Sequence, residues 1–444
     1  MALGFFKNIF DKKVSLDQTE YVAEKISVAI VAFEDDCITN SGKVLSEYLK
    51  EIKELSICYF DKPINKKFLD LQSRNFFDFI DTGKSILKRT ETEVLIWGYR
   101  EQDRIRLSFQ TADQYQDQGV PNFSLLNSLY LPLEYFQEKK LPQSMIDLIF
   151  AVILTVFKKE KNKYLLQQTV AQINECSPPK DLSLSCMPYI LNLLALTYLN
   201  SVRFNLTKQD IKIVSSIFKN AVGYCGKNSR SLLEGLVYAN LGQVYHLATE
   251  TDCDDKYENC KFAIDFYTIA QKFFNRHTYP YDFANTAYRL SKLYFDYWKY
   301  TSDIQFLRNA VFQLRESQKV FTKIMFPKIW AETQKDLGLY LSMMAVFNRS
   351  YEIAKVAIEN YKNYQMIYNM ENFPLEWSKA HESIANIFYE CGKIYNSEEY
   401  FEEAAKYYVE SAQIYQEQNL SDSVKRVQKC ISKTDNYLRG FIYN

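Results

Sequence analysis

From residue 194 onward, small and bulky apolar residues recur in the same order five times along the chain. In each copy a small residue follows a bulky aliphatic one, and an aromatic or aliphatic residue comes three positions later. The small residues, spaced 47, 49, 47 and 47 positions apart, are Ala195, Gly242, Ser291, Gly338 and Ala385. These offsets put the side chains on one helical face, with a small residue where a second helix must approach closely. The pattern predicts five amphipathic helices.

A second helical pattern follows each of these segments. It begins with a small residue, has an aromatic or aliphatic residue four positions later, and usually another small residue after three more. Four clear copies, 47 residues apart, and one looser copy begin at Ala263, Ala310, Ala357, Ala404 and Val214. Tyr364 breaks the last small position of the copy that begins at Ala357. A fixed period of this length indicates stacked helical hairpins, five in all.

Proline marks the start of three of these units, at Pro280, Pro327 and Pro374. Proline suits the first turn of a helix because its missing N–H is not needed there. With the Leu-Gly-x-x-Tyr order at 241–245, region 185–425 resembles the tetratricopeptide repeat (TPR), although that family has a period of about 34 residues. The usual Trp four positions before the Gly is also replaced, for example by Tyr238. The near-47 period is similar to that of long-helix TPR arrays in bacterial proteins.

Residues 17–137 follow a different rhythm. Short runs rich in β-branched or aromatic residues predict strands at 27–33, 55–60, 94–99 and 104–110, and helical spacing predicts helices at 41–54 and 77–89. The last two strands flank 100–103 as a hairpin, and alternation along 104–110 predicts one wet face. This order indicates an α/β layer. It is similar to the N-terminal domain of the Tol-system propeller protein, which implies an accessory or interaction module.

At 444 residues the chain exceeds the usual size of one domain. The patterns predict four parts: an N-terminal arm (1–16), a small α/β domain (17–137), a helical linker segment (138–184) and five TPR-like hairpins with a C-terminal capping helix (185–444). The fold class expected is mainly α, a TPR-like α-solenoid of helical hairpins preceded by a small α/β domain.

Composition limits the cellular compartments and the classes of partner that we expect for this protein. Lys plus Arg and Asp plus Glu both number 54, so there is no basic excess to hold nucleic acid. Nine scattered cysteines without a Cys-x-x-Cys pair predict reduced thiols in the cytoplasm. No signal peptide is expected. The most apolar window, 148–157, is too short to span a bilayer and predicts a buried helix.

The first 13 residues allow two interpretations. Phe5, Phe6, Ile9 and Phe10 fall on one face of a possible helix with lysines nearby. Such a segment could lie on a membrane surface or dock to a partner. It could equally be an arm packed on its own protein, or frayed, and we favour that interpretation.

The sequence contains no motif that predicts a catalytic, metal or cofactor site. The three histidines, His246, His277 and His381, lack zinc-site spacing. Cys253 and Cys260 lie in a segment with Asp252, Asp254 and Asp255, which predicts a solvated acidic loop rather than a metal site. Residues 82–85 are similar to the end of a phosphate-binding loop, but Asp78 stands where that loop needs Gly, and the segment is helical in pattern. We therefore expect no enzyme, no metal and no cofactor.

In a TPR-like superhelix the first helix of each hairpin lines the concave groove. The side chains predicted to line a partner-binding groove are Gln243, His246, Asn285, Tyr288, Lys292, Phe295, Glu332, Lys335, Lys379, Glu382, Asn386 and Tyr389. A mixed polar and aromatic groove suits a peptide or protein partner. The first hypothesis is a non-catalytic scaffold or adaptor. The alternative is a regulator or sensor whose α/β domain binds a small molecule and signals through the repeats.

Overall fold

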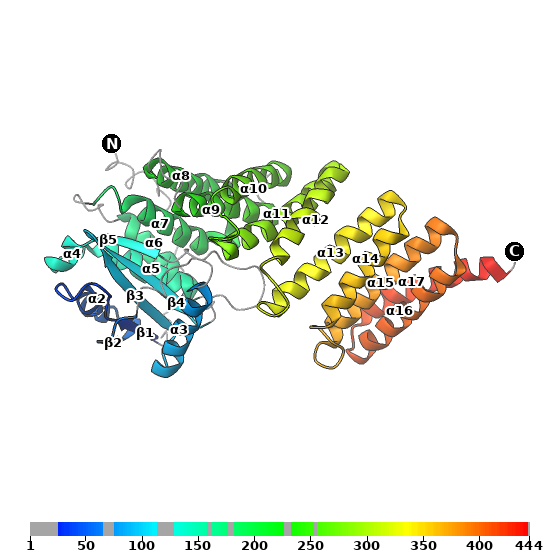
Figure 1. Ribbon diagram of the computed structural model, residues 1–444, viewed down its shortest axis with the longest axis horizontal. Coiled ribbons are helices and arrows are strands. Elements are labelled where there is room, and N and C mark those ends of the chain that lie inside the picture. Colours follow the sequence, from blue (N-terminus) through cyan, green and yellow to red (C-terminus); the bar gives the residue numbers. More distant parts are fainter. Residues whose placement is uncertain are drawn as a thin grey trace. The chain divides into compact units, whose positions relative to one another are not determined.

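The computed structural model describes residues 25–64, 75–112, 128–157, 162–175, 182–225, 232–251 and 255–442. Over these residues the fold is mainly α, with one small sheet near the N-terminus (Figure 1). The expected fold class is therefore confirmed. The N-terminal arm (1–16) and Cys253 lie outside the described residues, so their interpretations stay predictions.

The sheet contains β1 (Ile26–Val31), β2 (Leu55–Phe60), β3 (Val94–Glu101), β4 (Arg104–Thr111) and β5 (Ser128–Pro132), in the order β2-β1-β3-β4-β5. β1 is parallel to β2 and β3, while β3–β4 and β4–β5 are antiparallel. The parallel crossovers run through α2 (Ser41–Lys50) and α3 (Asn75–Thr90). The predicted strands, helices and hairpin are present, and β5, which no pattern had indicated, completes the sheet.

The expectation of a wet face along β4 is wrong for half of the strand. Ser108 and Gln110 are buried, at 5% and 0% exposure. The amide of Gln110 donates to the carbonyl oxygen of Ile80 at 3.0 Å, because α3 covers this end of the sheet. Only Arg104 and Arg106, at the other end of the strand, keep part of the polar face accessible.

The segment expected to be a linker (138–184) contributes helices to the hydrophobic core of the N-terminal unit. It contains α5 (Gln143–Val156) and α6 (Lys163–Glu175), preceded by the short α4 (Glu134–Gln137). α5 packs on β4 and is buried along most of its length, as expected for its apolar window. One hydrophobic core runs from β1 through the sheet to α9. Among the described helices, none combines the length and apolarity required to cross a bilayer.

Helical hairpins follow, as the spacing predicted. The pairs are α7 (Met187–Val202) with α8 (Lys208–Tyr224), α9 (Leu232–Glu250) with α10 (Lys256–Gln271), α11 (Pro280–Thr301) with α12 (Ile304–Gln318), α13 (Pro327–Asn348) with α14 (Tyr351–Gln365), and α15 (Pro374–Tyr395) with α16 (Glu398–Glu417). The short 3-10 helix η4 (Arg203–Asn205) joins the first pair, and α17 (Ser421–Ile442) packs on α16. Each proline predicted to start a helix is the first residue of one.

The small residues have the packing role that their spacing indicated. A Cβ added to Gly242 would lie 2.8 Å from the ring of Tyr267, and one added to Gly338 would lie 2.8 Å from the ring of Tyr361. Both tyrosines are the aromatic residues of the second helical pattern and are buried. The missing side chain thus lets each tyrosine lie against the backbone of the first helix.

The chain divides into two compact units, one reaching Thr286 and the other running from Ala287 to Asn444. The division falls within α11. The first unit holds the sheet and its shared core, and the second has a core of its own around Ala385, Tyr408 and Tyr415. The predicted limits at 137 and 184 are not tested by this division and stay predictions.

Candidate functional site

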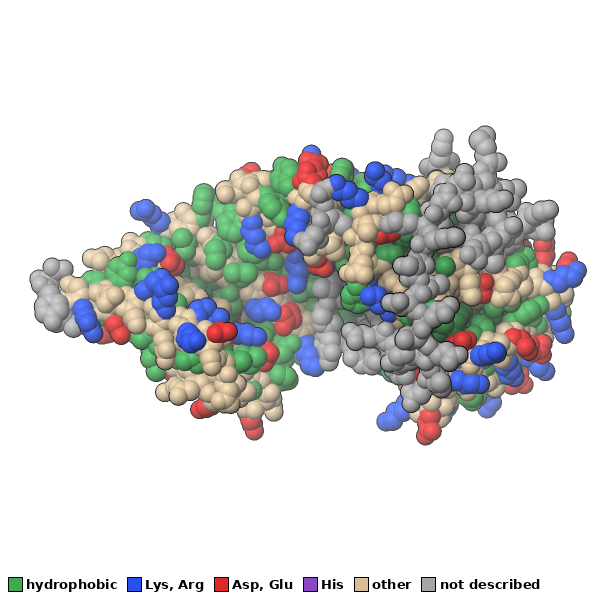
Figure 2. Space-filling model, turned by 180° about the vertical axis from the view of Figure 1, so that it is seen from behind, with side chains coloured by type: hydrophobic (Ala, Val, Ile, Leu, Met, Phe, Trp, Pro, Cys, Tyr) green, Lys and Arg blue, Asp and Glu red, His purple; other side chains and the backbone are tan. Residues whose placement is uncertain are grey.

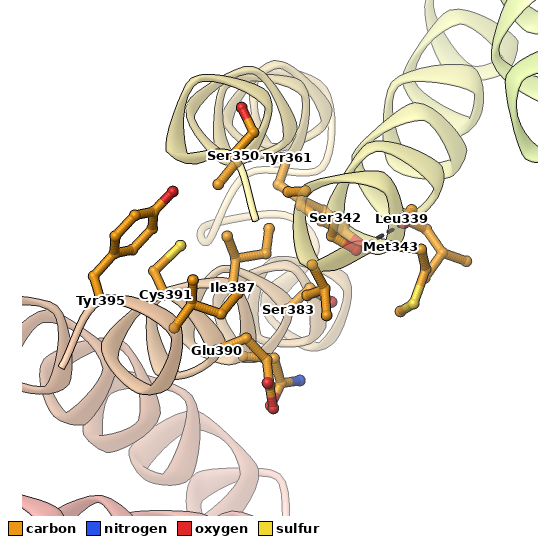
Figure 3. Close-up of a pocket in the computed structure, with 15 residues that line it drawn as sticks. Leu339, Ser342, Met343, Ser350, Tyr361, Ser383, Ile387, Glu390, Cys391 and Tyr395 are labelled. Carbon is orange, nitrogen blue, oxygen red and sulfur yellow. Dashed lines mark hydrogen bonds between the residues drawn. The ribbon is translucent and has the colours of Figure 1, made fainter. Parts of the chain in front are cut away.

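A cavity of about 130 Å³ lies among α13, α14 and α15 of the C-terminal unit. Figure 3 shows Ser342, Tyr361 and Ile387 reaching the same space from three different helices. Most of its wall is apolar, contributed by Leu339, Met343, Ala345, Val346, Ala354, Ile387 and Ile394. The cavity therefore sits on the first helices of the fourth and fifth hairpins, beside the start of α14.

Exposed apolar side chains continue the cavity wall onto the surface. Met343 and Val346 are 37% and 42% exposed, and the adjoining Phe347 is 59% exposed. The last turns of α13 are apolar on several faces, although only one face packs on α14. Single exposed apolar residues are normal, but a group beside a cavity is typical of a binding surface.

Two serines of the wall have their hydroxyl hydrogen atoms directed into their own helices. The Ser342 hydroxyl donates to the carbonyl of Leu339 at 2.7 Å, and the Ser383 hydroxyl donates to the carbonyl of Lys379 at 2.9 Å. Glu390 forms an ion pair with Lys393 at 2.9 Å. The cavity thus offers mainly apolar contacts.

Cys391 also lines the cavity, and its environment suppresses thiol chemistry. Burial, together with the nearby carboxylate of Glu390, raises the pKa of the thiol to about 11. Because the thiolate is the nucleophilic form, the Cys391 side chain is an unreactive apolar group at neutral pH. This wall is suited to binding.

The predicted groove residues of the third and fourth hairpins mostly contact other residues of the protein. Tyr288 and Phe295 are 2% and 9% exposed, and the Phe295 ring stacks on Tyr340 of α13 at 4.4 Å between centroids. The amine of Lys292 lies 3.8 Å from a carboxylate oxygen of Asp336. In the same region Glu332 and Lys335 form an ion pair with each other on α13, three residues apart. α11 and α13 are thus joined by the residues that were expected to face a partner.

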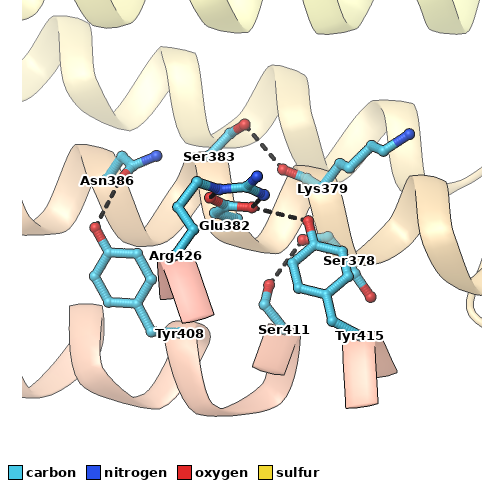
Figure 4. Close-up of polar contacts among 9 residues, drawn as sticks. All are labelled: Ser378, Lys379, Glu382, Ser383, Asn386, Tyr408, Ser411, Tyr415 and Arg426. Carbon is cyan, nitrogen blue, oxygen red and sulfur yellow. Dashed lines mark hydrogen bonds and ion pairs between the residues drawn. The ribbon is translucent and has the colours of Figure 1, made fainter. Parts of the chain in front are cut away.

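The fifth hairpin uses its predicted groove residues in the same way. Glu382 accepts hydrogen bonds from Arg426 of α17 and from the Tyr415 hydroxyl, each at 2.8 Å (Figure 4). The Tyr408 hydroxyl donates to Asn386 at 2.6 Å. Tyr389 meets Tyr437 of α17 edge-on, at 5.8 Å between ring centroids. The exposed side chain of Lys379 lies on the same helix.

The remaining predicted residues belong to the N-terminal unit. Gln243 and His246 are half-buried on α9, where the His246 ring meets Tyr267 edge-on at 6.2 Å. Asn285, on α11, is fully buried. Of all the predicted groove residues, Asn386 lines the cavity. A partner-binding role for the predicted set stays a prediction.

The cavity residues that the sequence did not single out include Ser342, Met343, Val346, Ile387 and Glu390. A signal was present in the run Ser-Met-Met-Ala-Val-Phe at 342–347, which is apolar around the helix and not on one face only. That run is where α13 has more apolar side chains than its hairpin partner can cover.

The other candidate motifs carry no site among the described residues. Residues 82–85 lie inside α3, so they form helix and not a phosphate-binding loop, and a Cβ on Gly83 would collide with the Gln110 side chain. Over the described stretches of the chain, no three acidic, histidine or cysteine side chains gather as metal ligands would.

Comparison with protein families and with curated proteins found no match to this chain. Solved structures similar to it include BtubC (BKLC) from P. vanneervenii, at 14% identity and a TM-score of 0.37, over 63% of this chain and 93% of that one. Another is a Signal Transduction ATPase with Numerous Domains (STAND) protein with a tetratricopeptide repeat sensor from Pyrococcus horikoshii. It is 12% identical, with a TM-score of 0.35, over 93% of this chain and 70% of that one. The description as TPR-like hairpins therefore rests on this chain's own spacing and helices.

Proposed function

We propose that the protein is a non-catalytic interaction module whose C-terminal unit binds a peptide or protein partner. The observation that carries the proposal is the apolar cavity among α13, α14 and α15, with exposed apolar side chains beside it. A partner would insert one apolar side chain into the cavity. Its backbone would lie over Met343, Val346 and Phe347.

The size of the cavity favours a single side chain over a drug-sized ligand. Its volume of about 130 Å³ is close to that of engineered apolar cavities of about 150 Å³ that bind benzene. Pockets that enclose drug-sized ligands are larger, about 300–1,000 Å³. A Leu, Ile, Met or Phe side chain fits the space, and its burial contributes about 1.5–3 kcal/mol.

The surface of the C-terminal hairpins is suited to a partner of mixed character. Figure 2 shows hydrophobic side chains interspersed with lysines, arginines and acidic residues over the C-terminal hairpins. Met343 adds a flexible side chain that can adapt its shape to a partner. At protein interfaces, a few buried residues usually contribute most of the binding energy, and a polar rim surrounds them.

Filling the cavity tests the proposal. Peptides would be selected on the purified full-length protein from a random-peptide library, and their affinities for Ser342→Phe would be measured. The new ring is expected to occupy the cavity and to weaken selected peptides about tenfold or more, because the anchor loses its burial site. Replacing the anchor of a selected peptide with Ala should weaken it similarly.

Ser432→Phe is the matched control. Ser432 is an exposed helical serine on α17 whose hydroxyl donates to the carbonyl of Gln428, much as Ser342 bonds to its own helix. It should leave peptide affinity unchanged. Peptides that bind Ser342→Phe as tightly as they bind the wild type would show that the cavity is not the docking site. Circular dichroism of both variants checks that the helices remain.

A further inference from the structure

A row of three side chains crosses the polar end of the sheet in the N-terminal unit. Tyr99 of β3 and Tyr130 of β5 are the direct cross-strand neighbours of Arg106 on β4, so the three share one face. The guanidinium of Arg106 donates to the Tyr99 hydroxyl at 3.0 Å and to the Ser128 hydroxyl at 3.2 Å. Its central carbon is 5.5 Å and 5.9 Å from the centroids of the Tyr99 and Tyr130 rings.

Arg106 has no carboxylate partner among the described residues, and its Nε is buried without a hydrogen-bond acceptor. Burial acts to lower the pKa of Arg106, but the ordinary pKa of a guanidinium lies far above neutral pH. The side chain therefore stays charged. A partly buried cation bound only to neutral hydroxyls and aromatic faces lacks the anion that normally compensates it.

A second cation lies beside it. The guanidinium carbon of Arg104 is 4.5 Å from the centroid of the Tyr130 ring, and the group is bound to Glu101 at 2.9 Å. Two guanidinium groups are thus matched by one carboxylate, which leaves an excess of one positive charge in the cluster.

Tyrosine hydroxyls complete the surroundings. Tyr189, in the first turn of α7, lies 4.2 Å from Tyr130 between ring centroids. Burial raises the pKa of both hydroxyls, so they remain protonated donors. Neither has a hydrogen-bond partner within the part of the chain that the structure describes.

We propose that Arg104, Arg106, Tyr130 and Tyr189 form a binding site for a small oxyanion, a carboxylate or a phosphoryl group. Nε and the remaining Nη hydrogens of Arg106 supply the planar, paired donors that suit such an anion. The bound anion would provide the charge that the protein lacks there. It would touch both the sheet and α7, the first helix of the hairpins.

The inference uses residues of the N-terminal unit alone and does not depend on the cavity of the C-terminal unit. It assigns a ligand class to the regulatory alternative, in which the α/β part senses a small molecule. An anion held between β5 and α7 would be placed to influence the first hairpin.

Isothermal titration calorimetry of the full-length chain tests the site. Inorganic phosphate and citrate would be titrated separately, at constant ionic strength set with sodium chloride. The wild type should bind one of the two, phosphate indicating a phosphoryl ligand and citrate a carboxylate. Arg106→Gln should weaken that binding at least tenfold, since it removes a charge-assisted pair of hydrogen bonds.

Arg100→Gln is the control, with the same change in charge on the same hairpin. Arg100 is opposite Ile105 in the register, so it belongs to the other face of the sheet. It should keep wild-type affinity. Tyr99→Phe, which removes one hydroxyl bond to Arg106, should weaken binding several-fold. If circular dichroism shows that Arg106→Gln does not fold, Tyr99→Phe becomes the variant that decides the test.

Three results would overturn the inference. The wild type could bind neither probe, the folded Arg106→Gln variant could bind as tightly as Arg100→Gln, or, with Arg106→Gln unfolded, Tyr99→Phe could bind as tightly as the wild type. Any of them would make Arg106 a structural cation, held by its tyrosines alone.

Discussion

Asp336 illustrates, at the scale of single residues, how charged groups of the hairpins are held between helices. Its side chain is 14% exposed and faces Lys292 of α11 across 3.8 Å. Burial raises the pKa of this carboxyl above its ordinary value, although Lys292 and Lys335 act to lower it. The folded state therefore disfavours the charged form, and ionised Asp336 reduces stability at neutral pH.

Asp336→Asn should raise the free energy of unfolding at pH 7, because it removes the charge and nearly keeps the shape. A carboxyl with a raised pKa holds its proton longer in the folded state than in the unfolded chain. Stability is therefore lost as pH rises from the unfolded value of 3.8 through the folded one. The advantage of Asn should be full above that window and shrink as pH falls towards 4, as measured by urea unfolding.

The control for this prediction is Glu352→Gln on α14. Glu352 is 81% exposed and is paired with Lys355 at 2.9 Å. An exposed pair contributes little, so we expect nearly equal stability at both pH values. A loss of stability in Asp336→Asn at pH 7 would mean that the ion pair with Lys292 outweighs the cost of burial.

At the scale of elements, each hairpin depends on a close approach of its two helices. In α13 and α14 the approach is made by Gly338 against the ring of Tyr361. The same contact occurs between Gly242 and Tyr267, one hairpin before α11. Glycine costs about 1 kcal/mol in a helix relative to alanine, so its use here indicates that space is more important than helix propensity.

Gly338→Ala should destabilise the protein. The added Cβ would lie 2.8 Å from the Tyr361 ring, closer than real Cβ atoms come to their neighbours. Overpacking costs about 1–3 kcal/mol, and the gain in helix propensity offsets about 1 kcal/mol of it. We expect a net loss of up to about 2 kcal/mol in the free energy of unfolding, measured by denaturant titration.

Gly223→Ala makes the same substitution where there is room. A Cβ at this exposed position of α8 would meet nothing within 4 Å. It should leave stability unchanged or raise it by up to about 1 kcal/mol. If Gly338→Ala behaved like Gly223→Ala, Tyr361 would have to move freely, and the close packing of the hairpin would not be a source of its stability.

At the scale of the whole molecule, the sheet and the helices from α5 to α9 share one hydrophobic core. α5 packs on β4 and α7 packs on β5, and buried side chains from β1 to α9 belong to one cluster. The pattern of strands and helices along the sequence had predicted a small α/β domain at 17–137, separate from the hairpins. Because the core is shared, we do not expect residues 17–137 to fold without the helices that follow them.

A fragment of residues 1–137 should lack fixed tertiary packing, because the apolar sheet face that α5 and α7 cover would be open to water. A fragment of residues 1–275, which keeps α5 to α10, should fold. Near-ultraviolet circular dichroism and the cooperativity of thermal unfolding distinguish the two. A cooperative transition in residues 1–137 would establish the α/β segment as an independent domain.

Much of the architecture could be predicted from local spacing. Whether an amphipathic helix forms depends on residues one to seven positions apart. The small residue of the first helix, such as Gly338, recurs about every 47 residues, and this recurrence indicates that the hairpin is repeated. β5 escaped prediction because five residues ending in Pro132 carry too little pattern, and Ser128 and Tyr130 take their strand geometry from β4. Its existence depended on a partner strand.

The sequence by itself determined where the hairpins begin, which small residues admit the neighbouring helix, and that a small α/β layer precedes them. Only the tertiary structure decided which side chains stay available to a partner. Phe295 meets Tyr340, and Glu382 meets Arg426, across about one repeat length of chain. Local periodicity records which face of a helix is apolar, but exposure is set by contacts between helices that are distant in sequence. The cavity arises from such contacts, and the tyrosine-flanked arginine arises from the pairing of β3, β4 and β5.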